Sequence, residues 1–345
     1  MTRFSTLILA CALFAASPAR SEIDYRPINV AITDEVIIPA FTQLDQTAAQ
    51  QAALWAVACQ APSETTVSQL KTAFHEVSDA WANLFHWSIG PITLYLRRDR
   101  FYHWPERRNS IGKGLAALLA VNDEAKLAPE RFKKASVAVQ GLPALERLLF
   151  TETDVSQNPW ACKIGQSITA NLAAIASEVI VEWTDDIRGK LERGEAHMDY
   201  FSEPSDFVNR VFNELSTGYA MIKEQKILAV LGASAEKAKP LLLENRRSGR
   251  FMRNLNLNVK ALFQAQAVLA RSLPDSGIAA MADRQKKLLR LLDGLGSDDA
   301  AFTNPDHRDR VLAFTSALGE ARDAMEKAYV SHLGLTIGFN SLDGD

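Results

Sequence analysis

The chain has 345 residues, with 38 lysine and arginine residues against 41 acidic residues and a formal charge of −3. This weak negative charge argues against a nucleic-acid-binding protein, because such proteins concentrate basic side chains on one surface. The length is sufficient for two domains, each with a core of its own.

The first residues have the pattern of a secretory signal peptide. A basic start precedes the apolar run 4–16 and small residues, with suitable cleavage points after Ala19 and after Ser21. The run is shorter than the roughly 20 residues of a membrane helix, and we expect no transmembrane segment later in the chain. We predict a signal peptide over 1–21 and a periplasmic protein. A lipid anchor on Cys11 is less favoured, because few apolar residues precede it.

Removal of the signal peptide leaves two cysteines, Cys59 and Cys162. In an exported protein such a pair predicts a disulfide. Two buried free thiols are the alternative.

Apolar residues recur at helical spacing along most of the chain, and no strand-like alternation is sustained. The spacing predicts helices over 34–58, 67–89, 110–119, a motif helix that ends at residue 150, and then 159–191, 206–230, 251–269, 274–295 and 308–333. Short connections between long helices indicate antiparallel bundles. The polar segment 194–204 separates the two halves, so we predict helical bundles over 22–198 and 199–345.

The stretch 139–150 is the most informative part of the sequence. Gly141 precedes an apolar helical stripe, and Pro143 suits the first turn of a helix, where its missing N–H is not needed. Glu146 is the one acid in an otherwise apolar turn. If Glu146 faces inward, it needs a hydrogen-bond donor, a cation or a raised pKa.

Gly141, Glu146 and the Leu-Leu-Phe run after them closely resemble the GxHxxE signature of the imelysin family, the bacterial M75 peptidase and iron-associated group. Pro143 stands in the histidine position. The stretches 81–91, 100–105, 162–183 and the Gly338-Phe339-Asn340 tail are similar as well and follow in the same order. The resemblance implies an all-α fold of two four-helix bundles packed together, with the motif in a cleft between them. It also implies export, and either a part in iron uptake or metallopeptidase activity.

A metal site at the motif would lack the imidazole ligand of the family signature, because Pro143 has no ligand atom. A single carboxylate does not hold a transition metal firmly, so we doubt that Glu146 binds iron or zinc. We expect Glu146 instead to act as a cap or to pair with Arg100 or Arg246 across the cleft. No spacing argument supports further ligands from the acids on other helices, namely Glu76, Asp79 and Glu214.

Two other patterns compete for a function. His103 and Glu106 form an HxxE, but Pro105 between them interrupts a helix, and we regard the match as a decoy. The basic and aromatic stretch 97–104 is expected to be a loop whose aromatic side chains close the bundle end while its arginines pair with acids. The alternative is that this loop binds an anionic or sugar-like ligand.

The candidate cleft is therefore lined by Arg100, Trp104, Gly141, Pro143, Glu146, Arg246 and Asn340. We predict a periplasmic binding protein linked to iron acquisition, without peptidase activity, whose partner is a small ligand or an envelope protein. A divergent metallopeptidase with a different ligand set is one alternative. An envelope interaction module without a small ligand is the other.

Overall fold

The computed structural model describes residues 23–151, 154–302 and 304–338. This part of the chain is helical and contains no β-strand, which confirms the predicted all-α fold. The predicted signal peptide, Cys11 and Asn340 lie outside the described residues.

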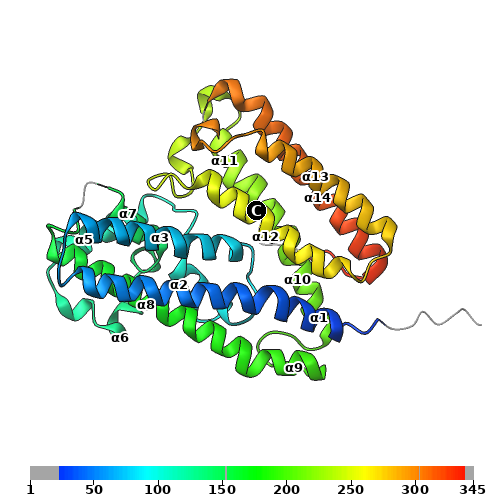
Figure 1. Cartoon of the computed structure of the whole chain (residues 1–345), viewed down its shortest axis with the longest axis horizontal. Helices are drawn as coiled ribbons and strands as arrows, with labels where there is room; N and C mark the ends of the chain where they lie inside the picture. The colour runs from blue at the N-terminus through cyan, green and yellow to red at the C-terminus, as the bar shows by residue number, and fades with distance from the viewer. Residues whose placement is uncertain (1–22, 152–153, 303, 339–345) are drawn as a thin grey trace, which may run out of the picture.

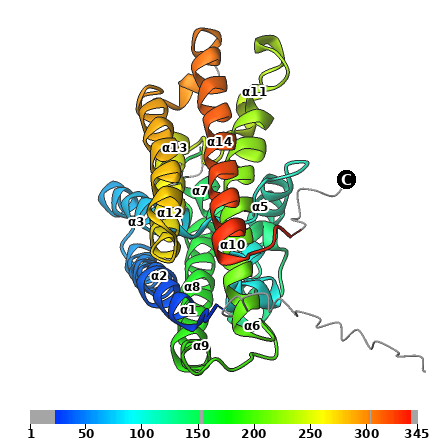
Figure 2. The same ribbon diagram turned by 90° about the vertical axis from the view of Figure 1, so that its right-hand side faces the viewer.

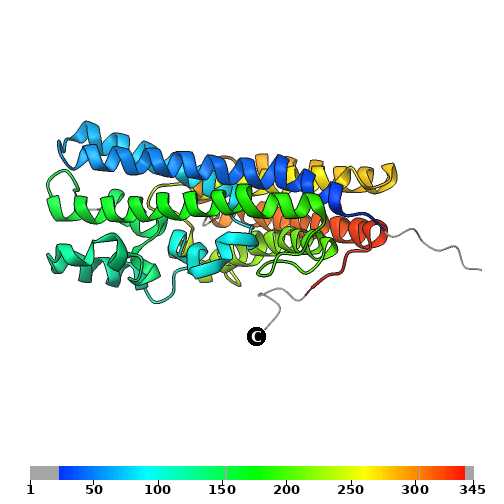
Figure 3. The same cartoon turned by 90° about the horizontal axis from the view of Figure 1, so that it is seen from below.

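The first half of the chain is built on three long helices that run side by side (Figures 1 and 3). Helix α1 (Arg26–Ile32) continues through a π-helical turn (Thr33–Ile37) into α2 (Ile38–Ala58). Helix α3 (Glu64–Leu84) begins at Ser63, whose side chain accepts the Thr66 N–H at 3.1 Å and so satisfies one free donor of the first turn. Helix α8 (Pro159–Glu182) continues through a second π turn (Trp183–Ile187) into α9 (Arg188–Arg193).

A disulfide joins two of these helices. Cys59, directly after α2, is bonded to Cys162 in the first turn of α8, with the two Cα atoms 5.7 Å apart. The pairing expected from the exported character of the chain is thus present in the structure. It closes a loop of 103 residues, which restricts the unfolded chain and favours the folded one.

The second half forms a helical layer over the first (Figure 2). Helix α10 (Pro204–Ala220) leads through a π-helical segment (Met221–Leu228) into α11 (Ala229–Leu231). The remaining long helices are α12 (Phe251–Ala270), α13 (Asp275–Asp293) and α14 (Arg308–Leu333). Helix α12 packs on α3, so the seam between the halves is a helix–helix contact, and one continuous apolar core spans both halves.

Most helix limits predicted from the spacing agree with the structure within a few residues, but the helix predicted to end at residue 89 ends at Leu84. Two regions differ more. The first helix begins at Arg26, eight residues before the predicted start. The stretch predicted as a basic and aromatic loop contains a short helix, α4 (Arg97–Phe101). Phe101 is fully buried and stacks on Trp81 at 4.7 Å between ring centroids, so tertiary packing overrides the local pattern.

One described helical rod, Pro159–Arg193, is long and apolar enough to cross a membrane by length and composition, contrary to our expectation that no such segment exists. In the structure 44% of this apolar window is buried, including Ile164, Leu172 and Val179, whereas Val181 is 49% exposed. Burial in the core accounts for the apolar residues on the face that packs against neighbouring helices.

Candidate functional site

The position of the motif helix α7 (Leu142–Leu149) is fixed by the residues at its N-terminus. Gly141 lies so close to the α4 segment that a Cβ atom there would stand 2.5 Å from the carbonyl oxygen of Phe101. Only glycine allows this approach, and Pro143 follows it in the first turn. The leucines of α7 face the core, and Glu146 is only 3% exposed. Because the leucines of α7 pack into the core, Glu146 on the same helix is buried where the two halves meet.

The partner of Glu146 comes from the second half of the chain. Ser248 donates to Glu146 Oε1 twice, from its backbone N–H at 3.0 Å and from its hydroxyl at 2.7 Å. The prediction of an arginine partner is wrong for both candidates, because neither Arg100 nor Arg246 bonds to Glu146 in the described structure. Two neutral donors replace the salt bridge, while Oε2 has no hydrogen-bond partner among the described residues.

Ser248 is presented by a tight turn before α12. Asn245 and Gly249 adopt left-handed backbone conformations with φ of 49° and 63°. Asn and Gly are the residue types that tolerate this region. The turn directs the Ser248 N–H across the seam toward α7.

A cleft of about 300 Å³ opens beside this contact, between the two halves. Its wall includes Tyr102, Trp104, Glu106, Arg107, Ile111, Pro143, Glu146, Arg147, Glu224, Leu241, Leu242, Leu243, Asn245, Arg246 and Arg247. The structure thus brings together four of the seven residues that we placed in a cleft: Trp104, Pro143, Glu146 and Arg246. Gly141 lies behind the wall at the start of α7, and Asn340 is outside the described residues.

Arg100 faces another part of the molecule. Its guanidinium donates to Gln140 Oε1 at 2.9 Å and to Asn171 Oδ1 at 2.6 Å, and it lines a separate cavity of about 420 Å³ beside α6 (Pro129–Phe132) and α8. The placement of Arg100 in the cleft was therefore wrong. It failed because neighbouring residues of a short helix point to different sides.

The charges of the cleft wall are unequal. Glu106 accepts the Arg147 guanidinium at 3.2 Å and the Ile111 N–H at 2.8 Å, at the start of α5 (Ser110–Ala120). Within the described chain no carboxylate pairs with Arg107, Arg246 or Arg247. Burial, together with the positive charges of Arg147 and Arg246, lowers the pKa of the Arg247 guanidinium. The negative charges of Glu146 and Glu106 act in the opposite direction. The wall therefore carries four arginines, Arg107, Arg147, Arg246 and Arg247, against three glutamates, which leaves a small excess of positive charge.

The donor set does not fit a chelated metal ion. Pro143 offers no ligand atom, Ser248 occupies one oxygen of Glu146, and the described residues contain no group of three or more His, Cys, Asp or Glu placed to hold a metal. The acids of other helices are engaged or turned outward. Asp79 pairs with Arg250 and Arg253, Glu214 accepts the Ser88 N–H at 3.2 Å, and Glu76 is exposed.

The two residues of the HxxE pattern, His103 and Glu106, have different partners in the structure. His103 Nε2 lies 3.4 Å from the Ser110 hydroxyl, whereas Glu106 turns toward Arg147 and α5. The two side chains hence do not act as a pair, but Glu106 itself belongs to the cleft. Our interpretation of the motif as a decoy for metal binding agrees with this geometry.

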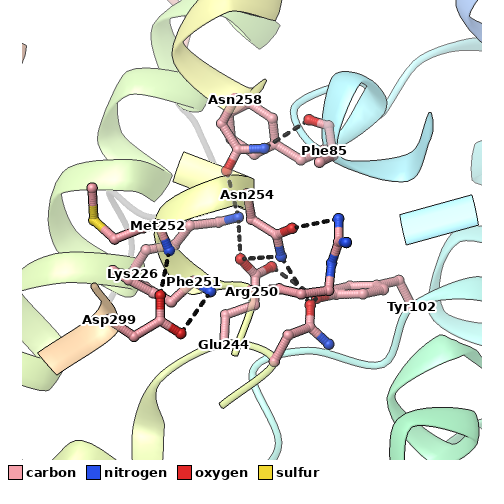
Figure 4. Close-up of polar contacts among 12 residues, drawn as sticks. Phe85, Tyr102, Lys226, Glu244, Arg250, Phe251, Met252, Asn254, Asn258 and Asp299 are labelled. Carbon is pink, nitrogen blue, oxygen red and sulfur yellow. Dashed lines mark hydrogen bonds and ion pairs between the residues drawn. The ribbon is translucent and has the colours of Figure 1, made fainter. Parts of the chain in front are cut away.

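A buried polar network lies beneath the cleft (Figure 4). Lys226 and Glu244, each 3% exposed, form an ion pair at 2.7 Å, and Lys226 also donates to Asn258 Oδ1 at 2.7 Å. Tyr102, whose ring borders the cleft, bonds Glu244 at 2.9 Å and Asn245 at 2.7 Å. Burial lowers the pKa of Lys226 and raises that of Tyr102, the nearby Glu244 adding to the second shift.

The sequence does not point to several residues in or beneath the cleft: Arg107, Arg147, Lys226, Arg247 and Ser248. Tyr102 belongs to the aromatic stretch 97–104 and Glu106 to the HxxE pattern, but the sequence places neither of them in the cleft. The run 246–250, Arg-Arg-Ser-Gly-Arg, gave a usable signal, since two cations before a Ser-Gly turn mark a rigid polar loop. No pattern in the sequence indicates that this loop meets α7, because the contact joins positions 102 residues apart.

The fold and the cleft define a class of helical protein with two stacked layers and a polar site at their seam. The chain belongs to the imelysin family, whose model, described as peptidase M75, matches residues 37–325. The resemblance drawn from the motif is thereby confirmed. No curated relative matches the sequence.

Two solved structures share the fold. An imelysin-like protein from Psychrobacter arcticum 273-4 is 18% identical, with a TM-score of 0.77 over 92% of this chain and 99% of its own. A putative iron-regulated protein A precursor from Parabacteroides distasonis ATCC 8503 is 13% identical, with a TM-score of 0.74 over 92% of this chain and 97% of its own. At these identities the likeness establishes the architecture.

Proposed function

We propose that this chain is an exported binding protein linked to iron acquisition, that it holds its ligand in the cleft between the two halves, and that it has no peptidase activity. The observation that carries the proposal is the state of Glu146. In this chain the motif acid is bound by Ser248 and borders a cleft with surplus cations, so it shapes a binding site rather than a chelate.

The link to iron rests on the family and on the iron-regulated name of one structural neighbour. The signal-peptide pattern at the start of the chain and the disulfide support export. Hydrolysis would require an activated water or a nucleophile with its base. The proline in the histidine position and the engaged Glu146 argue against such a centre at the motif.

The test is metal analysis and calorimetry on the purified protein and on Glu146→Ala. We expect neither stoichiometric iron nor zinc after purification, and no tight uptake of the bare ions. Tight metal binding that disappears in Glu146→Ala would contradict a non-chelating cleft. Cleavage of a protein substrate that a chelator inhibits would favour the metallopeptidase alternative.

A further inference from the structure

The ligand class of the cleft can be derived from its unpaired charge; this step rests on the proposed function. We propose that the cleft binds a small organic anion with several carboxylate groups, and that iron enters it as the anionic chelate of such a molecule. The evidence comes from the partners of each charged group, from the apolar wall and from the size of the cleft.

Each carboxylate of the wall already has a donor from the protein. Glu106 is bound by Arg147 and by a backbone N–H, and Glu146 is bound by Ser248. Glu224 lies 3.3 Å from Lys223 on the neighbouring position of the π-helical segment. None of the three acids is hydrogen-bonded to the remaining cations of the cleft.

Three arginines are left over: Arg107, Arg246 and Arg247. Within the described residues none of them donates a side-chain hydrogen bond to the protein. Arg247 is only partly exposed. Burial first, and then the like charges of Arg147 and Arg246, lower the pKa of its guanidinium, while Glu146 and Glu106 act in the opposite direction. Like charges held together around a hollow are stabilised by an anion between them. A bare metal cation would meet repulsion in the same place.

The rest of the wall favours an organic anion. Trp104, Pro143, Ile111 and the leucines of 241–243 give an apolar surface beside the guanidinium groups. An inorganic anion would leave this surface unused, whereas a carbon skeleton would cover it. Guanidinium groups bind carboxylates through paired N–H donors, so more than one arginine favours more than one carboxylate. A volume of about 300 Å³ suits a small molecule of this kind.

The test uses citrate and ferric citrate as probes, titrated calorimetrically into the full mature chain. Trimethyl citrate, which keeps the skeleton and removes the charges, is the matched ligand control, and pyrophosphate represents inorganic anions. We expect either citrate or ferric citrate to bind, trimethyl citrate to fail, and affinity to fall as salt is raised, since screening weakens exposed charge pairs.

Variants assign the binding to the cleft. Arg247→Gln and Arg246→Gln should each weaken citrate binding by roughly tenfold, the scale of one charge-assisted hydrogen bond. Arg131→Gln, an exposed arginine outside the cleft, should leave the affinity unchanged. An unchanged unfolding temperature in each variant shows that the fold is intact.

Glu146→Gln distinguishes an anion site from a metal chelate, because the two models predict opposite changes in ligand affinity. Removing a negative charge from an anion site should tighten citrate binding several-fold, whereas a chelate would lose its metal. Three results would overturn the inference: neither citrate nor ferric citrate binds, trimethyl citrate binds as tightly as citrate, or pyrophosphate binds more tightly than citrate.

The outcomes also distinguish the inference from the proposed function. If pyrophosphate binds more tightly than citrate and loses affinity in Arg247→Gln, the organic-anion model fails and a binding function of the cleft stands. If bare ferrous or zinc ions bind and are lost in Glu146→Gln while citrate does not bind, both the anion model and the non-chelating cleft fail. If citrate binds through the arginines but ferric citrate does not, the anion site stands and the link to iron fails.

Discussion

Two carboxylates cross the seam between the halves, one in each direction. Glu146 of the first half accepts the backbone N–H of Ser248 from the second, and Glu214 of the second half accepts the backbone N–H of Ser88 from the first. The contacts have the same chemistry and similar lengths, 3.0 and 3.2 Å. Their surroundings differ, and that difference separates a binding site from a structural contact.

Glu214 is only partly exposed, although its partner Ser88 is exposed. Burial raises the pKa of this carboxyl to about 7, against the opposing charge of Arg98. Around Glu146 the seam opens into a cleft in which Arg107, Arg246 and Arg247 have no carboxylate partner among the described residues. The same kind of hydrogen bond therefore holds a partly buried acid with a raised pKa at one place and borders the cleft at the other.

The largest expected effect concerns the network that spans the seam between these two points. In Glu244→Ala, the buried Lys226 loses its counter-ion and keeps only Asn258 as an acceptor, so we expect a loss of about 3–5 kcal/mol in the free energy of unfolding. Urea denaturation followed by circular dichroism measures it. The double variant Lys226→Met with Glu244→Gln removes both charges and keeps an acceptor for Tyr102.

The double variant should recover at least about 2 kcal/mol relative to Glu244→Ala, because the cost arises from an unpaired buried charge. Equal stability of Glu244→Ala and the native chain would show that the network does not hold the seam.

The next effect is a pH dependence at Glu214. Its pKa rises from 4.5 in the unfolded chain to about 7 in the folded one, so the folded state binds more protons between these values. The stability contribution is present below pH 4.5 and is lost as pH rises through 7. We expect the free energy of unfolding to fall by about 2 kcal/mol between pH 4.5 and 7. This value is smaller than the full pKa shift implies, because Glu214 is partly exposed.

Glu214→Gln should abolish this component and be more stable than the native chain at pH 8, as urea denaturation at several pH values would measure. Glu76→Gln, which changes an exposed acid, serves as the control. If the free energy of unfolding varied with pH in the same way in Glu214→Gln and in the native chain, the raised pKa of the Glu214 carboxyl would be contradicted.

Much of the fold can be read from the sequence, because helical spacing is a local signal. The helix predicted over 308–333 agrees with α14 at both limits, and most others agree within a few residues. The misplaced loop at α4 shows the limit of this reasoning. Arg97 is buried by bonds to Glu178 and Glu182 of α8, which lie more than 80 positions away in the sequence.

The site is less predictable for the same reason. The motif identified Glu146 and its inward direction, since an acid in an apolar turn needs a donor. Its donor, Ser248, belongs to a turn that only the stacking of the two halves brings near. Arg100 and Arg246 both carry the charge that would attract the motif acid, yet charge does not encode direction. Arg246 lines the cleft, whereas Arg100 lines the separate cavity beside α6 and α8.

The smallest expected effect tests whether the Glu146 contact itself stabilises the seam. Ser248→Ala removes the 2.7 Å hydroxyl donor and keeps the backbone donor at 3.0 Å, so we expect a loss of about 1 kcal/mol. Ser272→Ala, at an exposed position, should change nothing. A double-mutant cycle with Glu146→Ala isolates the pair, and its coupling should be of the order of 1 kcal/mol. A coupling near zero would mean that packing alone closes the seam here, leaving the acid's role to the charge balance of the cleft.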